Sequence, residues 1–201
     1  MTKIKICGLT NRASIETAVM AGAEYLGFVF AESTRKISPE KVRLLTTGLP
    51  KDIKKVGVFV SPKQAAVERI ITVAGLDLVQ IHGENRLASC SLPIIKAINV
   101  TKDQSFSNRK YPYLLLDAPP EKYMGGTGKT FDWNLVQDQS LPKEKLWIAG
   151  GLNAANVTEA IHRFNPQVVD VSSGVETNGE KDLHKIFAFC RAVNRADKES
   201  Y

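Results

Sequence analysis

The chain has 201 residues, of which 43% are hydrophobic and 24% are charged, and its formal net charge at pH 7 is +6. This length and composition are typical of one globular domain with a sizeable core. No apolar run approaches the ~18 residues of a membrane-spanning helix, and the first residues lack the pattern of a secretory signal. The positive charges are scattered and are not interleaved with aromatic residues, which disfavours a nucleic-acid interface. We therefore expect a cytoplasmic protein without a membrane or nucleic-acid partner.

The chain contains three cysteines, Cys7, Cys90 and Cys190. Their number is odd, their spacing is wide, and neither a C-x-x-C motif nor a histidine at metal-binding spacing accompanies them. These features predict reduced thiols in a reducing compartment and no metal site.

An apolar run, a turn of small or polar residues and a segment of helical spacing alternate along the chain. The expected strands are residues 3–7, 25–30, 55–60, 76–82, 94–100, 113–118, 146–151 and 168–173. Apolar residues at i, i+3, i+4 and i+7 predict helices over 15–22, 67–74, 157–164 and 183–190. The segments 86–92 and 101–110 are too short or too polar to carry a clear helical pattern.

Two Ser-Pro pairs indicate where helices begin. In "SPEK", residues 38–41, and "SPKQ", residues 61–64, the serine is a candidate N-cap and the proline occupies the first helical position. Gln64 lies three residues after Ser61 and would complete a capping box with it.

Strands that are joined by helices run parallel, and the nearly continuous apolar strands 55–60 and 113–118 suit burial on both faces. Eight such units in succession predict an α/β fold, a single-domain (β/α)8 barrel over residues 1–201 with a frayed tail at 195–201. A doubly wound open sheet is the alternative, because periodicity does not distinguish a closed sheet from an open one.

In both folds, ligands bind at the carboxyl ends of the strands. Polar or small residues occupy these ends in several expected strands: Cys7, His82, Asp117, Gly150 with Gly151, and Asp170 with Ser172 and Ser173. We expect these residues to meet at one rim of the sheet.

The turns "AGGLN" and "VSSGVE" follow the seventh and eighth expected strands. Their small residues are Gly150 and Gly151 in the first turn and Ser172, Ser173 and Gly174 in the second. Such turns let backbone amides approach an anion, and we expect helices to follow from Asn153 and from near Lys181. Either turn alone is explained as a tight connection. Together they predict a phosphate site, because barrels commonly bind phosphate between these two loops.

Cys7 and Asp117 are the candidate proton-transfer residues. Cys7 is the last strand residue before a glycine turn, where a thiol can reach a ligand and a nearby cation or the dipole of the phosphate site would favour the thiolate. Asp117 ends an apolar strand, where burial would raise its pKa and make it a proton donor. The alternatives are a cysteine that only packs and a carboxylate that caps loop amides.

Arg35, His82 and Asp170 each have two interpretations. Arg35, in "ESTRKIS", would hold a carboxylate with its planar fork or lie solvated in its loop. His82 would act as a base or as a hydrogen-bonded residue of the rim. Asp170 would accept a substrate hydroxyl or pair with a neighbouring lysine. The longest connection, 119–133, contains several glycines and is expected to close over a ligand.

Recognisable blocks of residues occur in order along nearly the whole chain: "KICGLT", "LGFVF" with "STRKISP", "VGVFV", "VQIHGE", "LLLDA", "GGTGKTFDW", "AGGLNAANV" and "VDVSSGVE" with "GEKD". In these blocks the chain resembles the phosphoribosylanthranilate isomerase family of tryptophan biosynthesis. The resemblance implies a (β/α)8 barrel that performs an Amadori rearrangement of a phosphosugar, N-(5-phosphoribosyl)anthranilate, without metal or cofactor. We expect a monomer or a weak homodimer.

By this resemblance, Cys7 is the general base and Asp117 is the general acid. Arg35 corresponds to the arginine that holds the anthranilate carboxylate. The turns at Gly150/Gly151 and Ser172/Ser173/Gly174 correspond to the phosphate cradle, and His82 and Asp170 correspond to supporting residues of the active-site mouth.

Besides a nucleic-acid module, which the salt dependence of binding would reveal, the residues by themselves leave two other functions open. One is another phosphosugar enzyme, such as a lyase or an epimerase. An epimerase often uses a metal with histidine ligands, and His82, His162 and His184 are too dispersed to suggest such a cluster. The other is a barrel that binds a phosphosugar without catalysis, which the presence of both Cys7 and Asp117 disfavours.

Overall fold

The computed structural model of the protein describes residues 1–101, 111–118, 133–136 and 143–199. Its strands form a closed barrel: β1 (Lys3–Cys7), β2 (Tyr25–Val29), β3 (Lys54–Val60), β4 (Leu78–His82), β5 (Ile94–Asn99), β6 (Tyr113–Asp117), β7 (Leu146–Ile148) and β8 (Val168–Val171). Each strand pairs in parallel with the next one, and β8 pairs in parallel with β1. The predicted barrel is therefore confirmed, and the open-sheet alternative is wrong.

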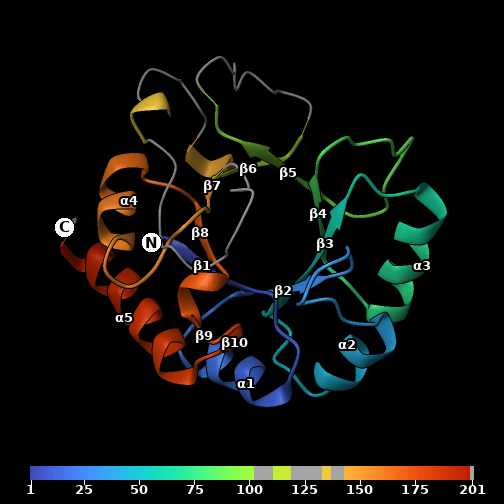
Figure 1. The fold of residues 1–201 in the computed structure, drawn as a ribbon, viewed down its shortest axis with the longest axis horizontal. Coiled ribbons are helices and arrows are strands. Elements are labelled where there is room, and N and C mark those ends of the chain that lie inside the picture. The colour runs from blue at the N-terminus through green and yellow to red at the C-terminus, as the bar shows by residue number, and fades with distance from the viewer. Residues whose placement is uncertain (102–110, 119–132, 137–142, 200–201) are drawn as a thin grey trace.

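The helices lie outside the ring of strands (Figure 1). They are α1 (Arg12–Met20), α2 (Pro39–Leu45), α3 (Gln64–Ala74), α4 (Val157–Phe164) and α5 (Leu183–Glu199). Within the described residues no α-helix connects β4 to β5, β5 to β6 or β6 to β7. The connection between β6 and β7 contains the short 3-10 helices η1 (Trp133–Val136) and η2 (Lys143–Lys145). The segment 86–92 is thus non-helical, in agreement with its polar pattern, whereas 102–110 and most of the predicted closing loop lie outside the described residues.

Two helix starts show how local signals succeed or fail. Ser38 is the N-cap of α2, since its Oγ accepts a 3.2 Å hydrogen bond from the Lys41 amide. The predicted capping box of Ser61 and Gln64 is wrong, because α3 begins only at Gln64. Ser61 has a φ of 41°, and its Oγ instead accepts a 3.0 Å bond from the Glu84 amide. Ser61 is therefore hydrogen-bonded to the loop after β4 and does not form the helix cap that the local pattern predicted.

The last two strands end earlier than their apolar patterns predict. β7 stops at Ile148, and Gly150 and Gly151 then adopt φ values of 83° and 68°. α4 begins at Val157 instead of at Asn153. After β8, the chain enters the 3-10 helix η3 (Ser173–Val175) and a small hairpin of β9 (Glu176–Thr177) and β10 (Glu180–Lys181) before α5.

The core has two parts because side chains of each strand alternate between the faces of the sheet. Ile4 and Ile6 face outward and pack in the large cluster with residues of the surrounding helices. Inside the barrel, Trp147 packs between Tyr25 and Tyr113, with ring-centroid distances of 4.7 and 5.8 Å. These apolar layers fill the interior toward the amino ends of the strands, which leaves the polar inward-facing residues at the carboxyl ends.

The last helix closes the barrel next to the N-terminus. α5 continues through Glu199, and the Asp197 carboxylate accepts hydrogen bonds from the amide and the hydroxyl of Thr2, at 2.6 and 3.0 Å. Helical structure and these contacts reach into the segment 195–201; its expected fraying and the single-domain assignment stay predictions.

Candidate active site

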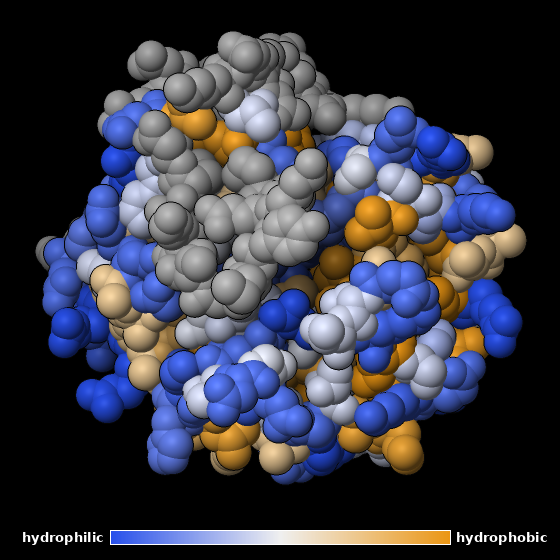
Figure 2. Space-filling model, in the orientation of Figure 1, coloured by the Kyte–Doolittle hydropathy of each residue, from blue (hydrophilic) through white to orange (hydrophobic). Residues whose placement is uncertain are grey.

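A cavity of about 690 Å³ opens at the carboxyl ends of the strands. In the orientation of Figure 2, this face has a depression near its centre where apolar side chains lie beside hydrophilic ones. The cavity is lined by every residue that the sequence nominated: Cys7, Arg35, His82, Asp117, Gly150, Gly151, Asp170, Ser172, Ser173 and Gly174. The barrel topology brings these residues together; their individual roles stay predictions.

Cys7 lies at the end of β1 and is buried. Burial raises the pKa of its thiol, and the nearby Lys5 and Lys181 ammonium groups only partly oppose this effect. The expected cations are therefore present and favour the thiolate, but burial outweighs them in the ligand-free site.

Asp117 ends β6, across the mouth of the barrel from Cys7. Burial raises the pKa of its carboxyl group to about 6, and the negative charge of Asp170 adds to this shift. This agrees with the predicted raised pKa. A carboxyl group with a pKa near 6 is protonated often enough near neutral pH to donate a proton.

Lys5 is a central residue of the site that the sequence analysis missed. It is fully buried inside the barrel, and its Nζ donates a 2.6 Å hydrogen bond to Oδ2 of Asp170. Burial alone would lower the pKa of Lys5, but the Asp170 charge and the Cys7 sulfur raise it. The strict alternation of "KIKIC" contained the signal, since it places Lys5 on the same face of the strand as Cys7.

The two carboxylate oxygens of Asp170 differ in their hydrogen bonding. Oδ2 is paired with Lys5, whereas Oδ1 is buried and has no hydrogen-bond partner among the described residues. Because Asp170 also lines the cavity, both of its predicted interpretations can apply: one oxygen pairs with a lysine, and the other is available to a ligand donor.

His82 is held by Gln80, a second residue that the sequence analysis missed. The Gln80 side-chain amide lies 2.8 Å from Nε2 of His82, where it donates to a neutral imidazole. Burial, reinforced by the charges of Lys5 and Lys96, lowers the pKa of His82 to about 4. His82 is therefore neutral near pH 7 and a weak base, which favours the interpretation as a hydrogen-bonded rim residue.

The two turns predicted to hold phosphate touch each other. A Cβ atom on Gly174 would lie only 1.9 Å from the Leu152 carbonyl oxygen, so a side chain at this position would force the turns apart. Ser173 begins η3 directly after β8, and the turn at Gly150 and Gly151 precedes α4. Both turns therefore present backbone to the same side of the cavity, as an anion site requires.

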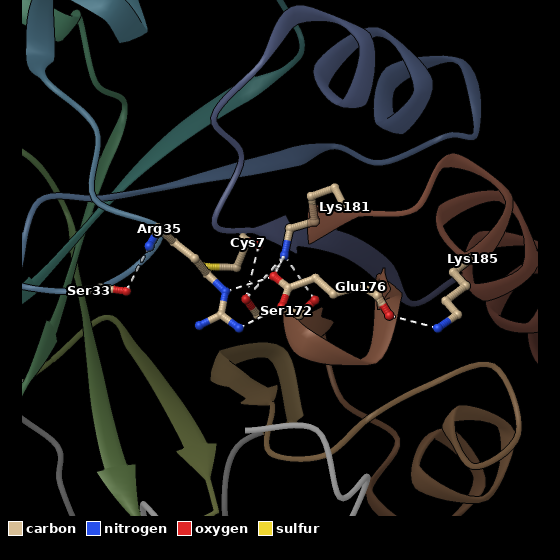
Figure 3. A network of polar contacts seen from close by, with 7 residues as sticks. All are labelled: Cys7, Ser33, Arg35, Ser172, Glu176, Lys181 and Lys185. Carbon is tan, nitrogen blue, oxygen red and sulfur yellow. Dashed lines mark hydrogen bonds and ion pairs between the residues drawn. The ribbon is translucent and has the colours of Figure 1, made fainter. Parts of the chain in front are cut away.

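Arg35 makes a two-point contact with Glu176 (Figure 3). Its Nε donates to Oε1 at 2.7 Å and its Nη2 donates to Oε2 at 2.6 Å. The interpretation of Arg35 as a merely solvated loop residue is thus wrong for the ligand-free protein. Glu176 and its second partner, Lys181, were not nominated from the sequence, because neither follows a strand pattern.

The described residues contain no group of three or more His, Cys, Asp or Glu side chains placed to hold a metal ion. None of the helices in the described part of the chain is long and apolar enough to cross a membrane.

A closed parallel barrel that gathers acid/base side chains and glycine turns at the carboxyl ends of its strands defines the class of (β/α)8-barrel enzymes. Residues 4–192 match the profile of the N-(5'-phosphoribosyl)anthranilate (PRA) isomerase family, and the chain belongs to that family.

Individual relatives support this membership. The chain is 50% identical over 196 residues to the N-(5'-phosphoribosyl)anthranilate isomerase of Streptococcus gordonii, covering 96% of this chain and 98% of that protein. The crystal structure of phosphoribosyl anthranilate isomerase from Thermotoga maritima aligns with a TM-score of 0.85 at 37% identity, over 97% of this chain and 100% of that one. A crystal structure of a phosphoribosyl anthranilate isomerase in complex with reduced 1-(o-carboxyphenylamino)-1-deoxyribulose 5-phosphate aligns with a TM-score of 0.81 at 34% identity, over 97% of this chain and 100% of that one.

Proposed function

We propose that Cys7 and Asp117 are the base and the acid with which this chain isomerises N-(5-phosphoribosyl)anthranilate to 1-(2-carboxyphenylamino)-1-deoxyribulose 5-phosphate in tryptophan biosynthesis. The family membership of the chain supports the reaction. The observation that carries the assignment of residues is that a thiol on β1 and a carboxyl group with a raised pKa on β6 line one cavity.

The Amadori rearrangement needs one acid and one base. Asp117 protonates the ribose ring oxygen, the C1'–O bond breaks, and the anilino nitrogen forms a Schiff base with C1'. The Cys7 thiolate then removes the proton from C2', which gives an enolamine. The enolamine becomes the product ketone when the C2' hydroxyl loses its proton and C1' gains one. The hydrogens move within the substrate and through the two side chains, so no redox cofactor takes part.

The two pKa shifts determine how much enzyme is ready to react. The pKa of Cys7 is raised by burial and that of Asp117 is about 6, so near neutral pH the predominant free form carries a thiol and a carboxylate. The productive form, with a thiolate and a carboxylic acid, holds the same number of protons and is a minor species in equilibrium with it. The buried Lys5 favours the thiolate in this minor form.

The remaining nominated residues hold the two ends of the substrate. Arg35 binds the anthranilate carboxylate, and the amides of the turns at 150–151 and 172–174 bind the phosphate. Asp170 accepts a ribose hydroxyl with its unpaired Oδ1, and neutral His82 lines the same cavity from β4, on the other side of the closed barrel. Holding both ends fixes C1' and C2' between the acid and the base, which supplies much of the catalytic effect.

Assembly and location belong to the same proposal. We infer a cytoplasmic monomer or weak homodimer; a Thermotoga maritima structure with a TM-score of 0.80 is described as monomers generated from a dimeric enzyme. Sedimentation velocity over a range of protein concentrations distinguishes the two states. A stable dimer at nanomolar concentration would contradict this part.

The direct test of the activity is a fluorescence assay. N-(5-phosphoribosyl)anthranilate is generated in situ, and its anthranilate emission is followed after the purified protein is added. The proposal predicts a protein-dependent fall in emission that does not require an added metal and persists in the presence of EDTA. An unchanged emission with folded protein would contradict the proposed function.

A further inference from the structure

Glu176 lies between Arg35, which lines the cavity, and Lys181, and it belongs to neither the acid/base pair nor the proposed contacts with substrate. It comes directly after η3, where β9 begins, and its side chain is only 6% exposed. It accepts both hydrogen bonds from Arg35 and a 2.5 Å hydrogen bond from Nζ of Lys181, whose side chain is 2% exposed. A carboxylate with two cationic partners in a nearly dry setting is held in one geometry.

The contact with Glu176 uses one edge of the Arg35 guanidinium group and leaves the other. Nε and one N–H of Nη2 donate to Glu176, while Nη1 lies away from it in Figure 3. The remaining N–H of Nη2 and those of Nη1 form the second edge, which matches a further carboxylate in two-point geometry. Glu176 thus fixes the plane of the guanidinium without occupying the edge that a ligand would use.

The backbone and the aliphatic part of the Arg35 side chain are also held in place by neighbouring residues. The Arg35 amide donates a 3.1 Å hydrogen bond to Oγ of Ser33. A Cβ atom on Gly8 would lie 2.6 Å from Cδ of Arg35, so the arginine stem crosses directly over the residue that follows Cys7. The absence of a side chain on Gly8 lets the guanidinium reach the rim beside the thiol.

The charges of this cluster also favour an anionic ligand. Arg35 and Lys181 carry two positive charges and Glu176 carries one negative charge, so a ligand carboxylate would neutralise the cluster. Lys181 is further tied to Ser172, donating to its carbonyl oxygen at 2.9 Å and to its Oγ at 3.3 Å. Oγ of Ser172 in turn donates to the Cys7 carbonyl oxygen at 3.2 Å. A single hydrogen-bonded network therefore joins Arg35, the turn after β8 and the end of β1 (Figure 3).

We propose that Glu176 is a positioning residue for substrate recognition: it orients Arg35 so that the guanidinium edge turned away from Glu176 selects a ligand that bears a carboxylate. This rests on the proposed function, in which Arg35 binds the anthranilate carboxylate. Glu176 touches neither the substrate nor the reacting atoms and acts through Arg35.

The test compares the affinities of two inhibitors measured by calorimetry. One is reduced 1-(2-carboxyphenylamino)-1-deoxyribulose 5-phosphate, and the other is the same compound without its carboxylate. The ratio of their dissociation constants measures carboxylate selection alone. We expect the wild type to prefer the carboxylated compound by about 10- to 100-fold, the range for a charged hydrogen-bonded contact, and Arg35→Met to abolish the preference.

Glu176→Gln keeps the size of the side chain and loses its charge. It should reduce the preference for the carboxylated inhibitor about tenfold or abolish it. In the Arg35→Met background, Glu176→Gln should change the ratio no further, because its effect passes through Arg35. The matched control is Glu16→Gln, which removes a carboxylate that accepts from Nε of Arg12 at 2.6 Å on the exposed face of α1 and should leave the ratio unchanged. Glu176→Asp retains the charge opposite Lys181, so it tests the same contact if Glu176→Gln does not fold; its shorter side chain should also lower the ratio.

The outcomes are distinct. Equal weakening of both inhibitors by Glu176→Gln or Glu176→Asp, with the ratio intact, would show a merely structural role and overturn the proposal. A wild-type preference that survives Arg35→Met would instead refute the assigned role of Arg35, and the positioning role of Glu176 with it.

Discussion

Lys5 and Asp170 are direct partners in the register of β1 and β8, and their side chains form a 2.6 Å ion pair inside the barrel. Lys5 lies two residues before Cys7 on the same face of β1, so the pair forms the layer next to the thiol. The ammonium group stabilises negative charge on both Asp170 and Cys7. The pairing of β1 with β8, which closes the barrel, therefore also supplies the electrostatic environment of the proposed base.

Because the Lys5–Asp170 ion pair is buried, loss of either partner should destabilise the protein. Asp170→Asn leaves the Lys5 ammonium group without its counter-charge, and we expect the free energy of unfolding to fall by about 3 to 5 kcal/mol. Urea unfolding at pH 7 measures the change. The double variant Lys5→Met/Asp170→Asn should recover a large part of the loss, because it no longer buries a charge. An Asp170→Asn protein as stable as the wild type would contradict the buried pair.

Asp117 should lower the stability of the folded protein at neutral pH. Its pKa rises from 3.8 to about 6 on folding, so the folded state binds protons more tightly than the unfolded chain. This contribution to stability is fully present below about pH 3.8 and is lost as the pH rises through about 6. Asp117→Asn, which cannot ionise, should therefore be more stable than the wild type by on the order of 3 kcal/mol at pH 7.5. Unfolding curves at several pH values should show this gain shrinking toward pH 4; a gain that does not depend on pH would contradict the shift.

His82 should remain neutral well below the pH at which an exposed histidine gains a proton. Burial lowers its pKa from 6.5 to about 4, so the stability that it contributes as a neutral group is present above about pH 6.5 and is lost as the pH falls toward 4. Ring ¹⁵N chemical shifts, followed by NMR between pH 4 and 8, measure its protonation. Titration of His82 near pH 6.5 would contradict the neutral, hydrogen-bonded interpretation.

Arg35→Met should act on substrate binding. Removal of a charged two-point contact should raise KM by about 10- to 100-fold, with a much smaller effect on kcat. Steady-state kinetics with the in situ substrate separate the two constants. A large fall in kcat at unchanged KM would place Arg35 in the transition state instead.

The strand order, the barrel and the set of residues at its mouth were predictable because they depend on local periodicity and on a general rule for parallel sheets. The contacts within the site were not. The Lys5–Asp170 pair depends on which residues of the first and last strands face each other, and the Arg35–Glu176 contact joins residues 141 positions apart. The helix cap predicted at Ser61 is wrong because the Glu84 amide that bonds to this serine comes from a different loop, which the local pattern does not include.

The central claim is that Cys7 and Asp117 transfer the protons of the isomerisation. Its most direct test is the turnover of Cys7→Ala and Asp117→Asn in the fluorescence assay, combined with the affinity of each variant for the reduced product analogue. Each substitution should lower kcat by at least about 10²-fold, the usual scale for a positioned acid or base, while the affinity stays close to that of the wild type. If Cys7→Ala or Asp117→Asn turns over substrate at nearly the wild-type rate, that side chain is only part of the packing or capping of the rim, and the proposed acid/base pair is wrong.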